Sequence, residues 1–315
     1  MNKHFPISLA FVCCLLFAIA LYPPQAGGEE KALDGLRPST LAGTWYPGTR
    51  DALARAVQGF LSEVEPTSLE GALKAVIVPH AGHRYSGRVA AHAYRLLKER
   101  QFVRVILVGP SHRVPFKGVS VNLQSGYETP LGVVPVDQQM GRDIVKAGPD
   151  FRWLKQAHAH EHSLEIQLPF LQTVLNNFRI IPILMGQQDY KTCLNLANAL
   201  VQVIGDTEDT LLLASSDLSH YHPYSQAGAL DLEFIKHIRG FDPQGLAGDL
   251  ISGKCEACGG GPVMTILLAA KAMGANHTVI LNHANSGDVT GDHSSVVGYV
   301  SAALIKSSDT GPHPR

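Results

Sequence analysis

The chain has 315 residues, of which 45% are hydrophobic and 17% charged, the balance of an ordinary folded globular protein. Lys and Arg number 26 against 27 for Asp and Glu, and no dense basic run occurs, so nucleic acid is excluded as an expected partner. The histidine count of 15 is high for this length, and the histidines gather at the ends of apolar runs.

The N-terminal segment has the layout of an export signal. A short basic start, residues 1–4, precedes an almost wholly apolar stretch over residues 7–22, and small residues around Ala26 offer a cleavage site. We therefore expect residues 1–26 to be a signal peptide, or an N-terminal membrane anchor if they are not cleaved, and the protein to be periplasmic or extracellular. Contact with a membrane is expected only through this segment. Residues 27–40, rich in Gly, Glu and Pro, are predicted to be a linker.

Export would also decide which cysteines remain. Cys13 and Cys14 lie in the signal segment, so the mature chain keeps Cys193, Cys255 and Cys258. An odd number of cysteines in an exported protein argues against a disulfide framework and leaves a thiol for another role.

Helical and strand patterns alternate over the rest of the chain. The first half predicts helices over 51–64, 87–100 and 138–146, strands over 75–78 and 105–108, and a pair of strands over 119–123 and 131–136. The second half predicts helices over 162–177, 194–204, 230–238 and 262–273, and strands over 180–185, 211–214, 279–281 and 296–305.

This alternation predicts one α/β domain over residues 41–306, a three-layer sandwich with a mostly parallel or mixed central sheet, followed by a disordered tail at 307–315. Two prolines refine the prediction. Pro169 indicates a kink or late start in its helix, and Pro182 favours an edge position for its strand.

Three of the predicted strands are followed within a few residues by a histidine, namely His80, His112 and His220. In open α/β sheets the ligand crevice lies outside the carboxyl ends of the strands, so these imidazoles are expected at one edge of the sheet. A single histidine there is more often an ordinary hydrogen-bonded residue. Two on consecutive strand–helix units, His80 and His112, favour a common metal or acid/base site.

Two further residues have side chains suited to such a site. Asp217 lies three residues before His220 and could orient its tautomer or share its ligand sphere, while also capping a helix. Cys258 precedes three glycines and a predicted helix, and a helix N-terminus lowers a thiol pKa toward the thiolate that binds metals. Cys255 completes a CxxC pair, but a structural zinc site needs four ligands, so Cys255 is expected to be a bystander.

A dense polar patch lies between these motifs, with histidines at 158, 160 and 162 beside Glu161 and Glu165. Exposed histidine-rich tracts often have no specific role, but Glu161–His162 at the start of a predicted helix is typical of a site. No serine lies in a nucleophile-elbow pattern and no glycine-rich loop suits a phosphate, which argues against serine hydrolases and nucleotide-binding enzymes.

Six ordered motifs resemble those of Memo-family proteins, which include protein B of the AmmeMemoRadiSam system. They are Ala42-Gly43-Thr44-Trp45-Tyr46-Pro47, Pro79-His80-Ala81-Gly82 with Tyr85-Ser86-Gly87, Gly109-Pro110-Ser111-His112, Glu161-His162-Ser163-Leu164-Glu165, Ser215-Ser216-Asp217-Leu218-Ser219-His220 and Cys258-Gly259. The resemblance covers about residues 40 to 305, nearly the whole expected mature chain.

The resemblance implies a fold similar to the class III extradiol dioxygenases, which use non-haem iron. It implies one metal ion per chain on His80, His112 and Cys258. His220 resembles the acid/base histidine of the dioxygenases, and Asp217 would lie beside it. The dioxygenases have a carboxylate as their third ligand, so the cysteine argues against ordinary catechol cleavage, and a set of two histidines and one cysteine also suits copper.

The leading hypothesis is therefore a mononuclear iron or copper redox protein, with Glu161 and Tyr85 lining its pocket. The alternatives are a zinc-dependent hydrolase in which Asp217 or Glu161 activates water, and a non-catalytic binding or scaffold protein that uses the same cleft. The expected partner is a small-molecule or peptide ligand. The family resemblance adds a functional link to radical SAM and AMMECR-type proteins.

Overall fold

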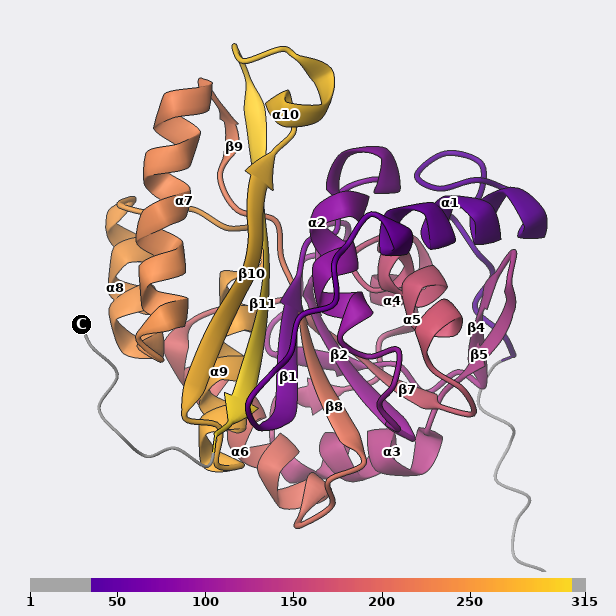
Figure 1. Ribbon diagram of the computed structural model, residues 1–315. Coiled ribbons are helices and arrows are strands. Elements are labelled where there is room, and N and C mark those ends of the chain that lie inside the picture. Colours follow the sequence, from indigo (N-terminus) through magenta and orange to yellow (C-terminus); the bar gives the residue numbers. More distant parts are fainter. Residues whose placement is uncertain (1–34, 308–315) are drawn as a thin grey trace, which may run out of the picture. The chain divides into compact units, whose positions relative to one another are not determined.

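The computed structural model describes residues 35–307 (Figure 1). The expected signal segment 1–26, the linker up to residue 34 and the tail from residue 308 lie outside the described residues. Among the residues that the structure describes, no helix combines the length and apolar character needed to cross a bilayer.

A mixed sheet forms the centre of the fold. Within residues 35–307 it has nine strands, eight of them in the order β10 (His277–Asn285), β11 (Val296–Lys306), β1 (Ala72–Val78), β8 (Thr210–Ser215), β2 (Arg104–Pro110), β7 (Arg179–Met185), β3 (Val119–Val121) and β6 (Phe151–Arg152), with β9 (His220–His222) paired to β11. The central strands β1, β8, β2 and β7 are mutually parallel. They are short apolar runs buried on both faces, as expected of parallel strands covered by helices.

Helices cover both faces of this sheet, so the domain has three layers (Figure 1). One face packs against α1 (Arg50–Ser62), α2 (His83–Arg95), α4 (Lys155–Ala159) and α5 (Leu168–Val174), and the other against α3 (Gln138–Ala147), α6 (Tyr190–Ile204), α7 (Tyr224–Arg239), α8 (Pro243–Ser252) and α9 (Gly260–Ala272). Alternate strand residues enter the two cores. Val76 and Val78 of β1 face one core, and Ala75 and Ile77 face the other. The predicted three-layer α/β sandwich with a mixed sheet is confirmed.

The predicted strand pair over 119–123 and 131–136 is wrong. Residues 119–121 form β3, which joins the main sheet beside β7. The hairpin partner is instead β4 (Gly126–Thr129), which pairs with β5 (Gly132–Pro135). Only two residues separate these strands, and Gly132 after the turn has a φ of +124°, a conformation that glycine adopts at little cost.

The predicted edge position of the strand that contains Pro182 is also wrong, because β7 lies between β2 and β3. The carbonyl of Pro182 accepts a hydrogen bond from the backbone N–H of Asn122. The backbone nitrogen and carbonyl of Pro182 therefore point toward β3. β3 ends at Val121, where regular pairing with β7 stops. The missing N–H of the proline therefore costs no ladder hydrogen bond inside the sheet.

Helix boundaries differ by a few residues. α5 starts late, at Leu168, with Pro169 in its first turn, as the sequence predicted, and the short helix η1 (Glu165–Gln167) precedes it. α7 begins six residues before its predicted start, and α8, α10 (Gly287–Thr290) and β9 have no counterpart in the prediction. Residues 37–40, assigned above to a linker, pack into the domain, where Arg37 is buried and paired with Glu165.

Candidate metal centre

The three histidine-bearing segments meet at one edge of the sheet. β1 and β2 flank β8 on either side, so their parallel carboxyl ends are adjacent. His80 and His112 follow β1 and β2 directly, and Asp217 follows β8. Cys258 reaches the same point from the loop before α9. The sheet topology therefore brings together residues that are remote in sequence, as expected for a crevice at the carboxyl ends of parallel strands.

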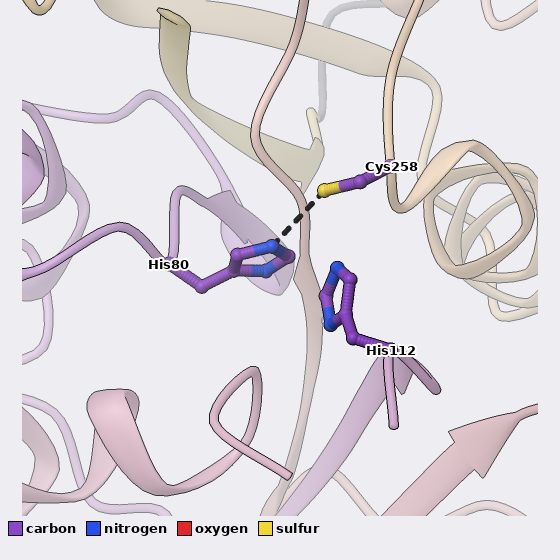
Figure 2. Close-up of side chains that lie close together, drawn as sticks. All are labelled: His80, His112 and Cys258. Carbon is purple, nitrogen blue, oxygen red and sulfur yellow. Dashed lines mark hydrogen bonds between the residues drawn. The ribbon is translucent and has the colours of Figure 1, made fainter. Parts of the chain in front are cut away.

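Figure 2 shows the side chains of His80, His112 and Cys258 pointing toward one another. One ligand atom from each of the three lies within 4.8 Å of the other two. Sγ of Cys258 is 3.0 Å from Nε2 of His80, a hydrogen-bond distance for a thiol and a bare imidazole nitrogen. Two nitrogens and one sulfur thus surround a common point.

The orientation of His80 is fixed by Ser215. The Ser215 hydroxyl donates to the carbonyl of Ser163 at 2.6 Å, so it can only accept from Nδ1–H of His80 at 2.9 Å. Nδ1 therefore carries the proton and Nε2 presents its lone pair to Cys258. Burial, followed by the neighbouring histidines His162 and His112, lowers the pKa of His80 well below its usual value and keeps the ring neutral.

Glu161 fixes the orientation of His112. Nδ1 of His112 lies 2.9 Å from Oε1 of Glu161, which leaves Nε2 free to face the centre. The carboxylate also accepts the backbone N–H groups of His112, His162 and Ser163. Burial opposes its ionisation, but these hydrogen bonds, led by the one from the His112 ring, hold the pKa of Glu161 below its usual range. A carboxylate behind a histidine fixes its tautomer and raises its basicity as a ligand.

The predicted effect of the helix N-terminus on Cys258 is wrong. Burial, followed by the nearby Asp217, raises the pKa of the Cys258 thiol, because the side chain is desolvated. The thiol is therefore protonated unless a cation displaces its proton. The next residue has to be glycine, because a Cβ on Gly259 would lie 2.4 Å from the carbonyl oxygen of Ser215. Cys193, Cys255 and Cys258 are all free thiols in the described part of the chain, and Cys255 is buried beside the centre.

Asp217 does not orient His220 as predicted. Oδ1 of Asp217 accepts the backbone N–H groups of His80 at 2.7 Å and Ala81 at 3.3 Å, so it fixes the turn that carries His80. Nδ1 of His220 bonds instead to the carbonyl of Leu218 at 2.7 Å, which leaves its Nε2 bare. Burial raises the pKa of Asp217 to about 7, against the opposing effect of these hydrogen bonds. Burial lowers the pKa of His220.

Two cavities meet at the centre. The larger, about 770 Å³, is lined by His80, His112, Asp217 and His220 together with Tyr85 and Trp45. The smaller, about 640 Å³, reaches Cys258 and shares His112 and His220 with the larger one. Glu161 is not among the described residues that line either cavity, so its predicted place in the pocket wall is wrong; it lies buried behind His112.

His162 and Trp45 also belong to this site. The sequence marked Glu161–His162 as typical of a site and Trp45 only as part of a family motif, and it assigned no role to either His162 or Trp45. The His162 ring stacks on His112 at a centroid distance of 4.3 Å, and the Trp45 ring packs at a tilt against His162 at a centroid distance of 4.5 Å. Burial lowers the pKa of His162 to about 4. The position of Glu161–His162 at a predicted helix start therefore pointed to the right part of the polar patch, whereas His158 is buried in hydrogen bonds to Ser120 and Tyr127.

A second group, His112, Glu161 and His162, also has ligand-type atoms close together. Its carboxylate is already used by four N–H groups, so this group fits a support for His112 better than a second cation site.

Comparisons with known proteins agree on the family. A family model described as Memo-like protein matches residues 37–303. A MEMO1 family protein of Methanothermobacter thermautotrophicus is 37% identical over 272 residues, which cover 84% of this chain and 98% of the relative. A MEMO1 family protein of Methanopyrus kandleri is 36% identical over 279 residues, which cover 85% of this chain and 98% of the relative.

Among solved structures, the crystal structure of an uncharacterized protein from Escherichia coli K12 is similar with a TM-score of 0.51 and 13% identity, covering 74% of this chain and 99% of that chain. At this identity the likeness concerns the fold alone. The family match and the identities to the curated relatives together establish that this chain belongs to the Memo-like protein family.

Proposed function

We propose that this protein is a mononuclear metal protein with redox chemistry, holding one iron or copper ion per chain on His80, His112 and Cys258. The observation that carries the proposal is the convergence of two imidazole nitrogens and one sulfur within 4.8 Å of one another. Two imidazoles with one thiolate suit copper, and three protein ligands with open positions suit non-haem iron.

The chemistry of the donor set fits a cation. His80 and His112 are held with Nδ1–H engaged and Nε2 bare, which is the tautomer that a ligand needs. The Cys258 thiol lies at hydrogen-bond distance from Nε2 of His80, and a bound cation would displace the thiol proton into solvent. Such an ion would supply electron transfer or activation of a bound molecule.

The residues around the centre would bind substrate and move protons. His220 faces both cavities, and its bare Nε2 can accept a proton from a bound molecule. Asp217 positions His80 through the backbone rather than acting on His220. The larger cavity, with Trp45 and Tyr85 in its walls, is of a size for a small organic molecule or a peptide side chain.

One observation favours a second candidate, a zinc-dependent hydrolase. Two imidazoles and a thiolate also form a catalytic zinc site with an open fourth position. Asp217 lines the larger cavity, and its pKa of about 7 suits a group that takes a proton from water. Glu161, the other carboxylate considered for this role, lies behind His112 and is shielded from the cavity.

Two broader parts of the proposal rest on the sequence. Export through residues 1–26 would place the site outside the cytoplasm, which favours copper over iron. A functional link to radical SAM and AMMECR-type proteins is proposed on the family resemblance alone.

Elemental analysis of protein purified anaerobically from its native compartment tests the proposal. We expect about one iron or copper per chain, with sulfur among the ligands by X-ray absorption. Cys258→Ser and a His80→Ala/Cys258→Ala double variant should lose the metal, while Cys255→Ser, a matched thiol three residues away, should keep it. Zinc alone, without oxygen-dependent activity, would favour the hydrolase. Stoichiometric metal in the folded double variant would refute the ligand assignment.

A further inference from the structure

The segment over residues 37–46, here called the N-terminal strap, is fastened to the domain by the carboxylate of Glu165. Glu165 is completely buried at the start of η1. Among the described residues, the hydrogen-bond donors to its carboxylate all come from the strap: Arg37 Nη1 at 2.5 Å, Ser39 Oγ at 2.7 Å, Thr40 N and Oγ1 at 3.0 Å, Leu41 N at 3.0 Å and Tyr46 Oη at 2.7 Å.

A buried carboxylate is costly unless its charge is paired and its oxygens are hydrogen-bonded. Burial opposes ionisation of Glu165, but the Arg37 charge and the strap hydrogen bonds outweigh it and lower its pKa. Arg37 in turn donates to the carbonyls of His158 and Glu161, each at 2.7 Å. The ion pair therefore ties the strap to the segment that carries Glu161 and His162.

The strap brings one aromatic side chain to the candidate centre. The Trp45 ring packs 4.5 Å from the ring of His162, and both line the larger cavity. The Trp45 carbonyl also accepts the backbone N–H of His83, at the start of α2, at 2.9 Å. Trp45 therefore forms part of the cavity wall. Its backbone is held by the hydrogen bond to His83 and by the hydrogen bonds of the strap to Glu165.

We propose that Glu165 is a positioning residue, whose carboxylate holds the N-terminal strap so that Trp45 forms the wall of the substrate cavity against His162. The inference rests on the proposed function only in treating this cavity as the place where substrate binds. Glu165 is not among the described residues that line either cavity, and it is not one of the three ligand residues. Its loss should therefore displace Trp45 from the cavity wall and leave the ligand set in place.

Fluorescence of Trp45 tests this positioning role directly. The chain has two tryptophans, so Trp153→Phe leaves Trp45 as the sole reporter. In that background, Glu165→Gln replaces an acceptor oxygen with an amide that faces the strap's donors. We expect a red-shifted Trp45 emission and an acrylamide quenching constant raised about threefold, with native circular dichroism and unchanged metal content. Glu63→Gln, at an exposed ion pair with Arg88, is the control and should change neither signal.

A merely structural role for Glu165 would lower the thermal midpoint without moving the native Trp45 signal, and that result would overturn the proposal. If Glu165→Gln does not fold, a Ser39→Ala/Tyr46→Phe double variant removes two donors and keeps the ion pair. It should give an intermediate rise in quenching, and no rise would also overturn the proposal. Failure to find metal in the parent protein would refute the proposed function, and the Trp45 fluorescence result could still be interpreted.

Discussion

Ser215 and His80 lie 135 residues apart in sequence and are joined by a hydrogen bond of 2.9 Å that decides which nitrogen of His80 faces the candidate metal centre. The Ser215 hydroxyl has its single proton committed to the Ser163 carbonyl, and it also accepts from the side chain of Gln167 at 2.8 Å. Its remaining lone pair can only accept from Nδ1–H of His80. A serine that offers no ligand atom of its own therefore selects the ligating tautomer of His80.

Replacing Ser215 with alanine should weaken metal binding. Without the hydroxyl, Nδ1 of His80 has no acceptor and the ring is free to change tautomer, so we expect a loss of about 10-fold to 100-fold in metal affinity. Competition with a chelator of known affinity measures this loss. Ser301→Ala, which removes a buried hydroxyl without a hydrogen-bond partner in the described structure, is the matched control. Equal affinities in the two variants would contradict the assigned tautomer.

Glu161→Gln should have a similar effect through His112. The amide keeps the shape of the carboxylate but loses its charge, and one of its two positions becomes a donor facing N–H groups. We expect metal affinity to fall by about 10-fold to 100-fold and the free energy of unfolding to fall as well. Chelator competition and urea unfolding give the two values. Full affinity in a folded variant would show that the carboxylate does not support His112.

The pattern of a buried strand followed by a histidine predicted much of this site, because it depends only on local sequence and on the parallel arrangement of the strands. His80 and His112 each follow a buried strand, and the carboxyl ends of parallel strands all lie at the same edge of the sheet. The pattern gives the common edge without knowledge of strand order, and the observed order, with β8 between β1 and β2, brings the two histidines close together on it. It also predicted the neighbourhood of Asp217, although not its actual hydrogen bonds to the turn at His80.

The rest of the site depends on contacts that no local pattern records. Arg37 and Glu165 are 128 residues apart. The composition of the residues near Arg37 therefore predicts a linker, because nothing local indicates that Glu165 is their buried partner. Pro182 reads as an edge residue because the early end of β3 cannot be inferred from β7 itself. The thiol pKa of Cys258 follows burial, which overrides the local helix N-terminus.

Gly259→Ala should destabilise the protein and disturb Cys258. The added Cβ would lie 2.4 Å from the Ser215 carbonyl oxygen and 2.6 Å from Cβ of Ser216, so the backbone beside the thiol has to move. We expect a loss of about 1–3 kcal/mol in the free energy of unfolding, together with weaker metal binding. Gly248→Ala, in α8 with open space around its Cβ position, should be neutral or stabilising by up to about 1 kcal/mol. Denaturant unfolding compares the two, and equal stabilities would contradict the close approach.

Acid should destabilise the metal-free protein partly through His83. This buried ring bonds to the Ile166 carbonyl at 3.0 Å through Nε2, its Nδ1 has no partner in the described structure, and burial lowers its pKa from 6.5 to about 4. The unfolded chain therefore takes up the proton first. The stability due to neutral His83 is complete above pH 6.5 and falls as the pH drops toward 4, at up to about 1.4 kcal/mol per pH unit and about 3 kcal/mol in all. Urea unfolding between pH 7 and 4 should show a shallower slope for His83→Gln than for the parent, whereas His160→Gln, at an exposed histidine, should keep the parent slope. An unchanged slope in folded His83→Gln would show that another group takes up this proton.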